Sequence, residues 1–200
     1  SKVNMAVNNI FNKWEETKDD SLTQVVFLDR STPSKGFNLY DDIKSKLIAL
    51  GVPEEEIKFI HDAKNDKEKV KLFEDVNEGR VRILIGSTEK MGAGTNIQKK
   101  LCALHHIDVP WRPSDIEQRE GRILRQGNDC KEVEIFRYAT EGTFDSYSWQ
   151  TIEYKQKFIS QVMTNKPLGR SIDDVDEAAL NYAEIKSLAT GDPRIKRQLE

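Results

Sequence analysis

VRILIGSTEKMGAGTNIQ, residues 81–98, joins a short apolar run to a loop rich in glycine and small polar residues. An apolar, β-branched run of this length is typical of a buried strand in a parallel sheet. The glycines of the loop, Gly92 and Gly94, permit left-handed turns and close approach to a ligand. Because ligands of parallel α/β sheets bind at the carboxyl ends of the strands, we expect a functional loop directly after Gly86.

Strand and helix patterns alternate along the rest of the chain. The strand patterns lie at residues 23–29, 57–61, 81–86, 103–109 and 131–140. Helical spacing of apolar residues appears at residues 39–50, 70–79, 114–125, 143–163 and 175–189. Such alternation predicts an α/β fold with a parallel sheet covered by helices on both faces. We expect an N-terminal helix at residues 1–20, the α/β domain at 21–165 and a helical extension at 166–200.

The composition limits the kinds of partner and compartment. Lys and Arg number 31 against 34 Asp and Glu, so the formal charge of -3 gives no overall basic field, and any contact with nucleic acid must be local. The two cysteines, Cys102 and Cys130, form no CxxC motif and have no zinc spacing. With no apolar run long enough to span a bilayer, we expect a soluble, cytoplasmic protein with no metal site and no membrane partner.

The segment QREGRILRQG, residues 118–127, carries the strongest chemical signal. Gln118, Arg122 and Arg125 are four and three residues apart, a spacing that predicts one helical face. Two guanidinium groups aimed together offer permanent charge and forked donors, which suit the oxygens of a transferring phosphoryl group. A solvated, charged helix face is the alternative interpretation, and Gly121 within the predicted helix speaks against it.

These two segments resemble known helicase motifs. QREGRILR resembles motif six of superfamily-two helicases, QxxGRxxR, and the following RQGN resembles the RxGQ of Swi/Snf-type translocases. GSTEKMGAGTNIQ resembles helicase motif five. The resemblance implies the C-terminal RecA-like lobe of a P-loop NTPase-like helicase. Its implied site residues are catalytic Arg122, Arg125 and Gln118, ATP-binding Gly92, Gly94 and Asn96, and DNA-binding Ser87 and Thr88.

A longer run of the chain, from Ile60 to Pro193, resembles the helicase part of very large phage- and plasmid-borne polypeptides that join a DNA methyltransferase to a Swi/Snf-like helicase. Asn128 departs from the pattern, because many Swi/Snf members have glutamine there. The resemblance implies three partners, which are a first helicase lobe in the same polypeptide, DNA, and a linked methyltransferase domain.

The chain contains no GxxxxGK[ST] sequence and no DExH-type acid after a strand. It therefore lacks the residues that cradle ATP phosphates and hold magnesium in such motors. By the resemblance, ATP and magnesium are held mainly by the missing first lobe, and this chain is the second motor lobe, which supplies arginine fingers and contacts the DNA backbone. We expect the isolated chain to bind no cofactor and to hydrolyse no ATP.

Two other functions compete with this one. A lobe of this kind can become a non-catalytic docking or regulatory module, although the paired arginines argue against that. A methyltransferase-like nucleotide-binding enzyme is suggested by Gly92-Ala93-Gly94 after a strand, but Ile97 stands where the third glycine of a dinucleotide fingerprint belongs. Trp111, at a strand-to-helix corner, is expected to pack against the core.

Overall fold

The computed structural model describes residues 1–91, 95–140 and 142–163. Gly92, Gly94, the helix expected at residues 175–189 and the extension expected at 166–200 lie outside the described residues. Two compact units make up the chain, one formed by residues 1–108 and 116–138 and the other by residues 109–115 and 139–200. The first unit holds the whole sheet and the candidate site.

The sheet of the first unit has five strands in the order β2-β3-β1-β4-β5, and every neighbouring pair is parallel. The strands are β1 (Thr23–Phe27), β2 (Ile57–Phe59), β3 (Ile83–Gly86), β4 (Leu101–His106) and β5 (Glu134–Arg137). Their carboxyl ends lie at one edge, since Phe27 is in register with Gly86 on one side and His106 on the other. The predicted α/β sheet is confirmed.

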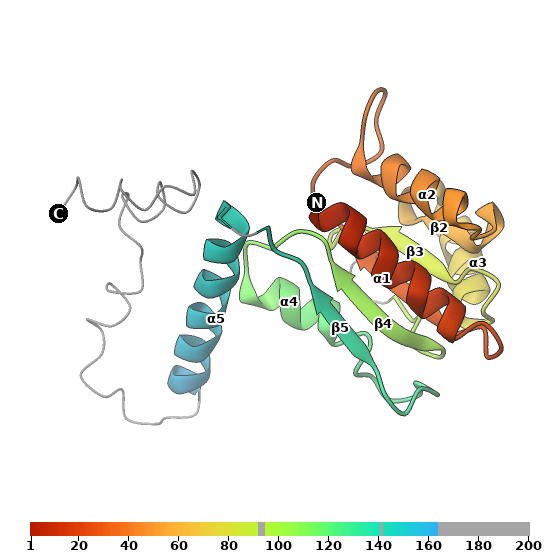
Figure 1. Cartoon of the computed structure of the whole chain (residues 1–200). Coiled ribbons are helices and arrows are strands. Elements are labelled where there is room, and N and C mark those ends of the chain that lie inside the picture. Colours follow the sequence, from red (N-terminus) through yellow and green to blue (C-terminus); the bar gives the residue numbers. More distant parts are fainter. Residues whose placement is uncertain (92–94, 141, 164–200) are drawn as a thin grey trace. The chain divides into compact units, whose positions relative to one another are not determined.

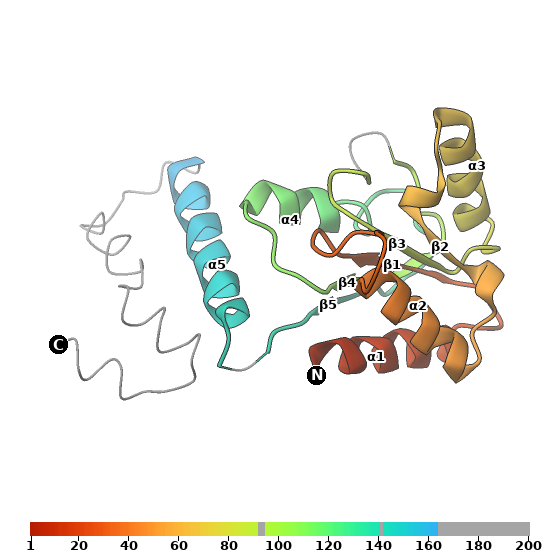
Figure 2. The same ribbon diagram turned by 90° about the horizontal axis from the view of Figure 1, so that it is seen from above.

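Helices cover both faces of this sheet (Figures 1 and 2). The α-helices within the described residues are α1 (Lys2–Glu16), α2 (Leu39–Leu50), α3 (Asp66–Asn77), α4 (Pro113–Glu120) and α5 (Phe144–Met163). One apolar core joins the buried sides of α1 and α2 to the sheet, through residues that include Ile10 and Ile43. A second core, on the other face, includes Val76 of α3, Met91 and Ile123.

Local signals explain the bounds of α2. Asn38 caps its start, where the Asn38 side chain accepts a hydrogen bond from the Asp41 backbone N–H at 2.9 Å. The helix stops at Gly51, whose φ of 111° is a left-handed conformation that favours glycine. The bounds predicted from apolar spacing, residues 39–50, are confirmed.

A series of hydrogen bonds, most of them buried, fixes α1 to the sheet. Asn9 donates to the Tyr138 hydroxyl (3.2 Å), which lies 2.8 Å from His105 Nδ1. His105 Nε2 lies 2.9 Å from Gln24 Oε1, and the Gln24 amide donates back to the Ile10 carbonyl at 3.0 Å. Burial lowers the pKa of His105 to about 3, so the imidazole is neutral in the folded chain.

The second unit includes α5, whose predicted extent is confirmed. Trp111 also belongs to this unit, and the expectation that it packs against the core is wrong, because 73% of its surface is exposed. The residue lies in an irregular bend before Pro113. Among the described helices, none is both long enough and apolar enough to cross a membrane.

Candidate functional site at the carboxyl edge of the sheet

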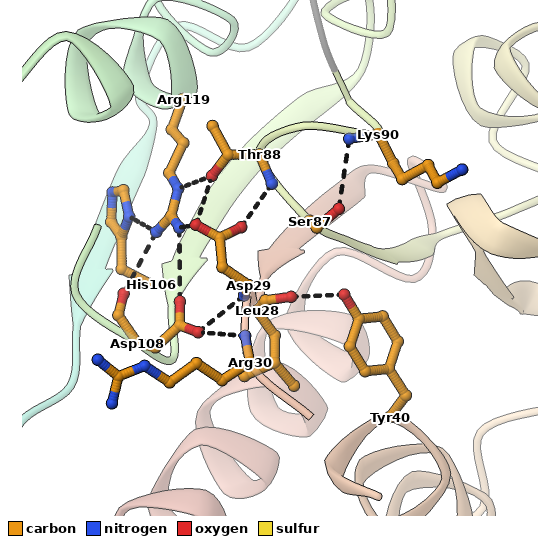
Figure 3. Close-up of polar contacts among 10 residues, drawn as sticks. All are labelled: Leu28, Asp29, Arg30, Tyr40, Ser87, Thr88, Lys90, His106, Asp108 and Arg119. Atoms are coloured by element: carbon orange, nitrogen blue, oxygen red, sulfur yellow. Dashed lines mark hydrogen bonds and ion pairs between the residues drawn. The ribbon is translucent and has the colours of Figure 1, made fainter. Parts of the chain in front are cut away.

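Polar residues gather just beyond the carboxyl ends of the three central strands. Asp29 follows β1, Thr88 follows β3 and Asp108 follows β4. Arg119 of α4 reaches this edge from the helix above it (Figure 3). The parallel register brings these strand ends together, although their residues are far apart in the sequence.

Arg119 is fully buried and is the centre of the cluster. Its Nη2 pairs with Asp29 at 2.5 Å and with Asp108 at 3.4 Å. Its Nε donates to Thr88 Oγ1 at 2.7 Å, and Nη1 donates to His106 Nδ1 at 3.0 Å. A buried guanidinium is tolerated only when its charge and donors are satisfied, and these partners satisfy them.

The backbone N–H and the hydroxyl group of Thr88 both form hydrogen bonds within the cluster. Its backbone N–H donates to Asp29 Oδ1 at 2.6 Å, and its hydroxyl lies 2.9 Å from Asp29 Oδ2. Because that hydroxyl also accepts from Arg119, its single proton is directed at the Asp29 carboxylate. Thr88 is therefore fixed by one carboxylate and one guanidinium (Figure 3).

Asp108 ties a second segment to the same cluster. Its Oδ2 accepts hydrogen bonds from the backbone N–H groups of Asp29 (2.7 Å) and Arg30 (2.8 Å). Burial raises the pKa of the Asp108 carboxyl, while the Arg119 charge acts to lower it. One carboxylate thus holds both the buried arginine and the start of the loop after β1.

His106 extends the cluster toward β5. Since a guanidinium can only donate, the His106 Nδ1 that faces Arg119 must accept, and its Nε2 carries the proton. That nitrogen lies 3.2 Å from Glu120 Oε1, which also accepts from Arg137 at 2.8 Å. His105, the neighbouring residue, bonds to different partners on the α1 side, as expected for adjacent positions of one strand.

The two predicted arginine fingers do not lie on the helix. The expectation of one helical face through Gln118, Arg122 and Arg125 is wrong, because α4 ends at Glu120 and turns follow. A Cβ atom at Gly121 would lie 2.7 Å from the Glu117 carbonyl, so this position of the turn excludes a side chain. Gln118 is exposed in the last turn of α4.

Arg122 and Arg125 nevertheless converge on one carbonyl group. Their Nη1 atoms lie 3.1 and 3.4 Å from the Thr95 oxygen, and Arg125 Nη1 is also 3.2 Å from Asn96 Oδ1. The two arginines differ in exposure, since Arg122 is buried and Arg125 faces solvent. Burial, with the nearby Arg125 charge, lowers the pKa of Arg122. Of the predicted ATP-binding residues that the structure describes, Asn96 lies beside the arginine pair.

Asn128 holds the end of this turn segment in place. Its side-chain amide donates to the carbonyls of Leu101 (2.7 Å) and Ile123 (3.0 Å), and its oxygen accepts from the Cys130 backbone at 2.8 Å. The residue that departs from the Swi/Snf pattern thus joins the segment that carries Arg122 and Arg125 to the start of β4.

The predicted DNA-binding pair is only partly accessible. Ser87 is buried, and its hydroxyl accepts a hydrogen bond from the Lys90 backbone at 3.3 Å. Thr88 is half-buried in the cluster, whereas Lys90 is exposed in the same loop and points away from Arg119 (Figure 3). Lys90 therefore offers an accessible positive charge next to Thr88 in this loop.

Sequence reasoning gave no site role to Asp108 or Arg119, and although it marked Asp29 as an acid at a functional strand end, it did not predict that Asp29 pairs with Arg119. Arg119 is one of several arginines in QREGRILR, and nothing local distinguishes it from a solvent-facing residue. The available signal was that one strand pattern ends in Asp29 and another carries Asp108 one residue before its end, since acids at the ends of neighbouring parallel strands lie together and require a cation.

The sequence matches a protein family described as the helicase conserved C-terminal domain over residues 15–127, which is more than half of the chain. The chain belongs to this family. The prediction of a superfamily-two helicase C-terminal lobe is confirmed at that level, and the paired arginines and Asn96 lie within the matched region of the helicase domain.

Two curated proteins are similar to this helicase domain over part of their length. It is 34% identical over 93 residues to Defense against restriction protein B of Escherichia phage P1. It is 33% identical over 92 residues to the uncharacterized ATP-dependent helicase YqhH of Bacillus subtilis strain 168. Each match covers 46% of this chain, but only 4% of the phage protein and 16% of YqhH. The chain therefore spans a small part of both relatives.

Solved helicase structures share the fold of this domain. The C-terminal part of the Fun30 ATPase domain matches 67% of the chain, and 40% of that structure, with a TM-score of 0.54 and 20% identity. The DUF1998 helicase MrfA bound to DNA matches 76%, and 20% of that structure, with a TM-score of 0.53 and 16% identity. The Pyrococcus furiosus Hef helicase domain matches 74%, and 28% of that structure, with a TM-score of 0.51 and 18% identity. The RecA-like fold is thereby confirmed.

Proposed function

We propose that this helicase domain is the second motor lobe of an ATP-dependent DNA helicase or translocase. ATP and magnesium are held mainly by a first lobe of the same polypeptide, and this lobe adds arginine fingers and a DNA contact. Membership of the helicase family supports the proposal, as do two similar proteins, one described as an ATP-dependent helicase and the other solved as a helicase bound to DNA.

The observation that carries the proposal is the convergence of Arg122 and Arg125 on the Thr95 carbonyl. Arg122 is buried and fixed in position, whereas Arg125 is exposed and can reach a ligand. Arg125 has forked donors that match the oxygens of a phosphoryl group. Asn96 beside it adds an amide. This donor set is cationic and neutral, so it fits the terminal phosphates and not their magnesium ion.

Each arginine has a distinct role in this mechanism. ATP supplies the phosphoryl group and the free energy of its transfer to water. Arg125 donates to the developing charge on that group and stabilises the transition state. Arg122 donates a hydrogen bond to the Thr95 carbonyl, which holds the segment in its conformation, and it adds a positive charge beside Arg125. Closing and opening of the cleft between lobes then moves the protein along DNA.

Arg119 acts as a positioning residue in this scheme. It joins the start of the segment that carries Arg122 and Arg125 to Thr88 in the loop assigned to DNA. The surface of this loop would contact the DNA backbone, with Lys90 as an accessible cation. Ser87 and Thr88 hold the loop in its conformation through their hydrogen bonds to Lys90 and Asp29.

Four finer assignments belong to the same proposal. The RQGN extension supports a Swi/Snf-like motor. The small share of the phage protein that the match covers supports a place within a very large polypeptide, to which a DNA methyltransferase domain is linked. The domain division is the N-terminal helix at residues 1–20, the lobe at 21–165 and a helical extension beyond. The compartment is the cytoplasm.

The test is DNA-stimulated ATP hydrolysis by the polypeptide that carries both lobes, with Arg125→Ala compared to wild type. Loss of an arginine finger should lower the rate about a thousandfold. Arg80→Ala is the matched control, because Arg80 is an exposed arginine of the same unit that pairs with Asp75 on the surface. Circular dichroism confirms that all three proteins are folded.

Normal hydrolysis by Arg125→Ala would contradict the finger assignment and favour the non-catalytic docking or regulatory module instead. The burial of Arg122 is the observation that already favours this second candidate. The 200-residue chain alone should hydrolyse no ATP, so turnover by the pure chain would contradict the requirement for a first lobe.

A further inference from the structure

The loop between β1 and α2 presents one aromatic ring to solvent. Phe37 is 79% exposed, although the loop begins at the carboxyl end of the central strand, the edge that also carries Thr88. The loop stands out beyond the start of α2 (Figure 1). A large aromatic side chain in such a position contributes almost no buried apolar surface to the lobe's own core.

Hydrogen bonds fix the first part of this loop. Asp108 Oδ2 accepts from the backbone N–H groups of Asp29 and Arg30. Ser31 has a φ of 56°, and its hydroxyl accepts from the Leu39 backbone N–H at 3.0 Å. The loop therefore starts from the buried cluster and is bridged to the first residue of α2.

The second part of the loop is fixed on both sides of Phe37. Asn38 is buried, and its amide donates to the Ser34 carbonyl at 3.2 Å and to the Asp41 carboxylate at 2.6 Å. Gly36 has a φ of 98°, a left-handed turn with open space around it. The ring is thus held outward by an ordered backbone, which reduces the entropy lost when it binds a ligand.

Two positive charges accompany the ring. Arg30 and Lys35 are both exposed, and neither side chain forms an ion pair with the described parts of the chain. An aromatic ring with unpaired cations in one loop is the combination that binds single-stranded nucleic acid, because bases stack on the ring and phosphates pair with the cations.

We propose that Phe37 stacks on an unpaired nucleobase of a DNA strand, with Arg30 and Lys35 on the adjoining phosphates. This deepens the proposed function and rests on it, since it names the form of DNA that the lobe engages. Bases within a blunt duplex are already stacked on one another, so the ring reaches a base only in a single-stranded segment. The proposal therefore assigns this lobe to DNA with an unpaired strand.

The experiment uses the 200-residue chain and two DNA probes. One is a single-stranded oligonucleotide that contains 2-aminopurine, a fluorescent base quenched by stacking, and the other is a blunt duplex of equal length. Wild type should quench the single strand. Phe37→Ala should weaken single-strand binding about tenfold, which is about 1.4 kcal/mol, and remove the quenching, because the variant loses the ring on which the base stacks. Its binding to the duplex should be unchanged.

Three further variants sharpen the result. Phe37→Leu keeps an apolar side chain without a ring and should behave as Phe37→Ala, whereas Phe37→Trp should retain quenching. Tyr154→Ala removes an exposed aromatic residue of α5 and should leave binding unchanged. Arg30→Gln and Lys35→Gln should weaken both DNA forms and reduce the salt dependence of binding.

Three outcomes would overturn the proposal. These are wild-type binding by Phe37→Ala, an equal loss of single-strand and duplex binding in that variant, and the absence of single-strand binding by the wild-type chain. The readout uses no ATP, so it can fail while the Arg125 experiment succeeds. An equal loss on both DNA forms would instead show that Phe37 supports the shape of the loop and does not stack on an unpaired base.

Discussion

The Arg119 guanidinium donates a hydrogen bond to the Thr88 hydroxyl over 2.7 Å, across 31 positions of the sequence. The bond joins α4, which leads into the segment of Arg122 and Arg125, to the loop that carries Lys90. Arg119 also lies over the Phe27 ring, with its central carbon 5.0 Å from the ring centroid. Its contacts thus combine charge, hydrogen bonds and packing in one buried side chain.

Replacement of Arg119 should destabilise the lobe strongly. Arg119→Ala leaves the Asp29 and Asp108 carboxylates without their shared cation, and breaking a buried ion pair costs about 3–5 kcal/mol. Arg119→Lys keeps the positive charge but loses the several N–H donors of the guanidinium, so we expect an intermediate loss of free energy of unfolding. Urea unfolding of the 200-residue chain measures both. Arg80→Ala serves as the surface control, and a loss for Arg119→Ala no larger than the control's would disprove the role of the cluster.

Asp29 and Thr88 should be energetically coupled. Because Thr88 gives both its backbone and side-chain protons to Asp29, Asp29→Asn and Thr88→Val each disrupt the same contact. In a double-mutant cycle we expect a coupling free energy of unfolding of about 0.5–3 kcal/mol. Asp75→Asn with Thr88→Val is the control cycle, since Asp75 contacts Arg80 and Lys71 instead. Additive effects in the Asp29 cycle would mean that the contact does not hold Thr88.

Lys90 should contribute to DNA binding through charge alone. Lys90→Ala removes one phosphate contact, so the slope of log K against log salt should fall by about 0.7–0.9. The loss of affinity should be the same for every DNA sequence. Lys71→Ala is the control, because Lys71 is exposed on α3 and pairs with Asp75. Binding titrations at several salt concentrations decide this, and an unchanged slope would remove Lys90 from the interface.

The buried His105 should make the lobe sensitive to acid. Its pKa is lowered to about 3 in the folded chain, while an unfolded histidine has a pKa of about 6.5. Above the unfolded pKa the full stability is present. As pH falls below it, only the unfolded chain takes up a proton here, so stability declines by about 1.4 kcal/mol per pH unit until the folded pKa is reached.

His105→Gln cannot titrate, so between pH 7 and pH 5 it should lose about 2 kcal/mol less stability than wild type. Chemical denaturation at the two pH values measures the difference. NMR titration of the His105 ring in the wild-type chain provides an independent readout if the variant folds poorly. A His105 pKa near 6.5 in the folded chain would contradict the prediction.

Gly79 should tolerate alanine less well than Gly51. Both have a positive φ, which costs alanine about 1–2 kcal/mol. A Cβ atom at Gly79 would also lie 2.6 Å from the Ser21 carbonyl oxygen, whereas nothing lies within 4 Å of one at Gly51. We therefore expect Gly79→Ala to lower the free energy of unfolding at least twice as much as Gly51→Ala. Equal losses would show that the Ser21 backbone gives way without cost.

Local patterns predicted the secondary structure well where the physical signal was itself local. Apolar residues at three- and four-residue steps, followed by a glycine, predicted α2 with its observed bounds. The end of α4 was not predicted, because charged residues continue at helical spacing through Arg125. The helix ends at the turn that contains Gly121. Beyond it, Arg122 and Arg125 donate hydrogen bonds to the Thr95 carbonyl, about thirty residues away in the sequence.

The sequence by itself determined the parallel α/β fold and the helicase motifs, because strand and helix periodicities and short motifs are properties of neighbouring residues. Only the tertiary structure decided which charges are buried. Arg119 and Arg125 look alike in the sequence, yet one lies between Asp29 and Asp108 and the other faces solvent. A buried charge needs an opposite charge beside it, and here the parallel register of β1 and β4 brings Asp29, 90 positions from Arg119 in the chain, next to Asp108, which is 11 positions away.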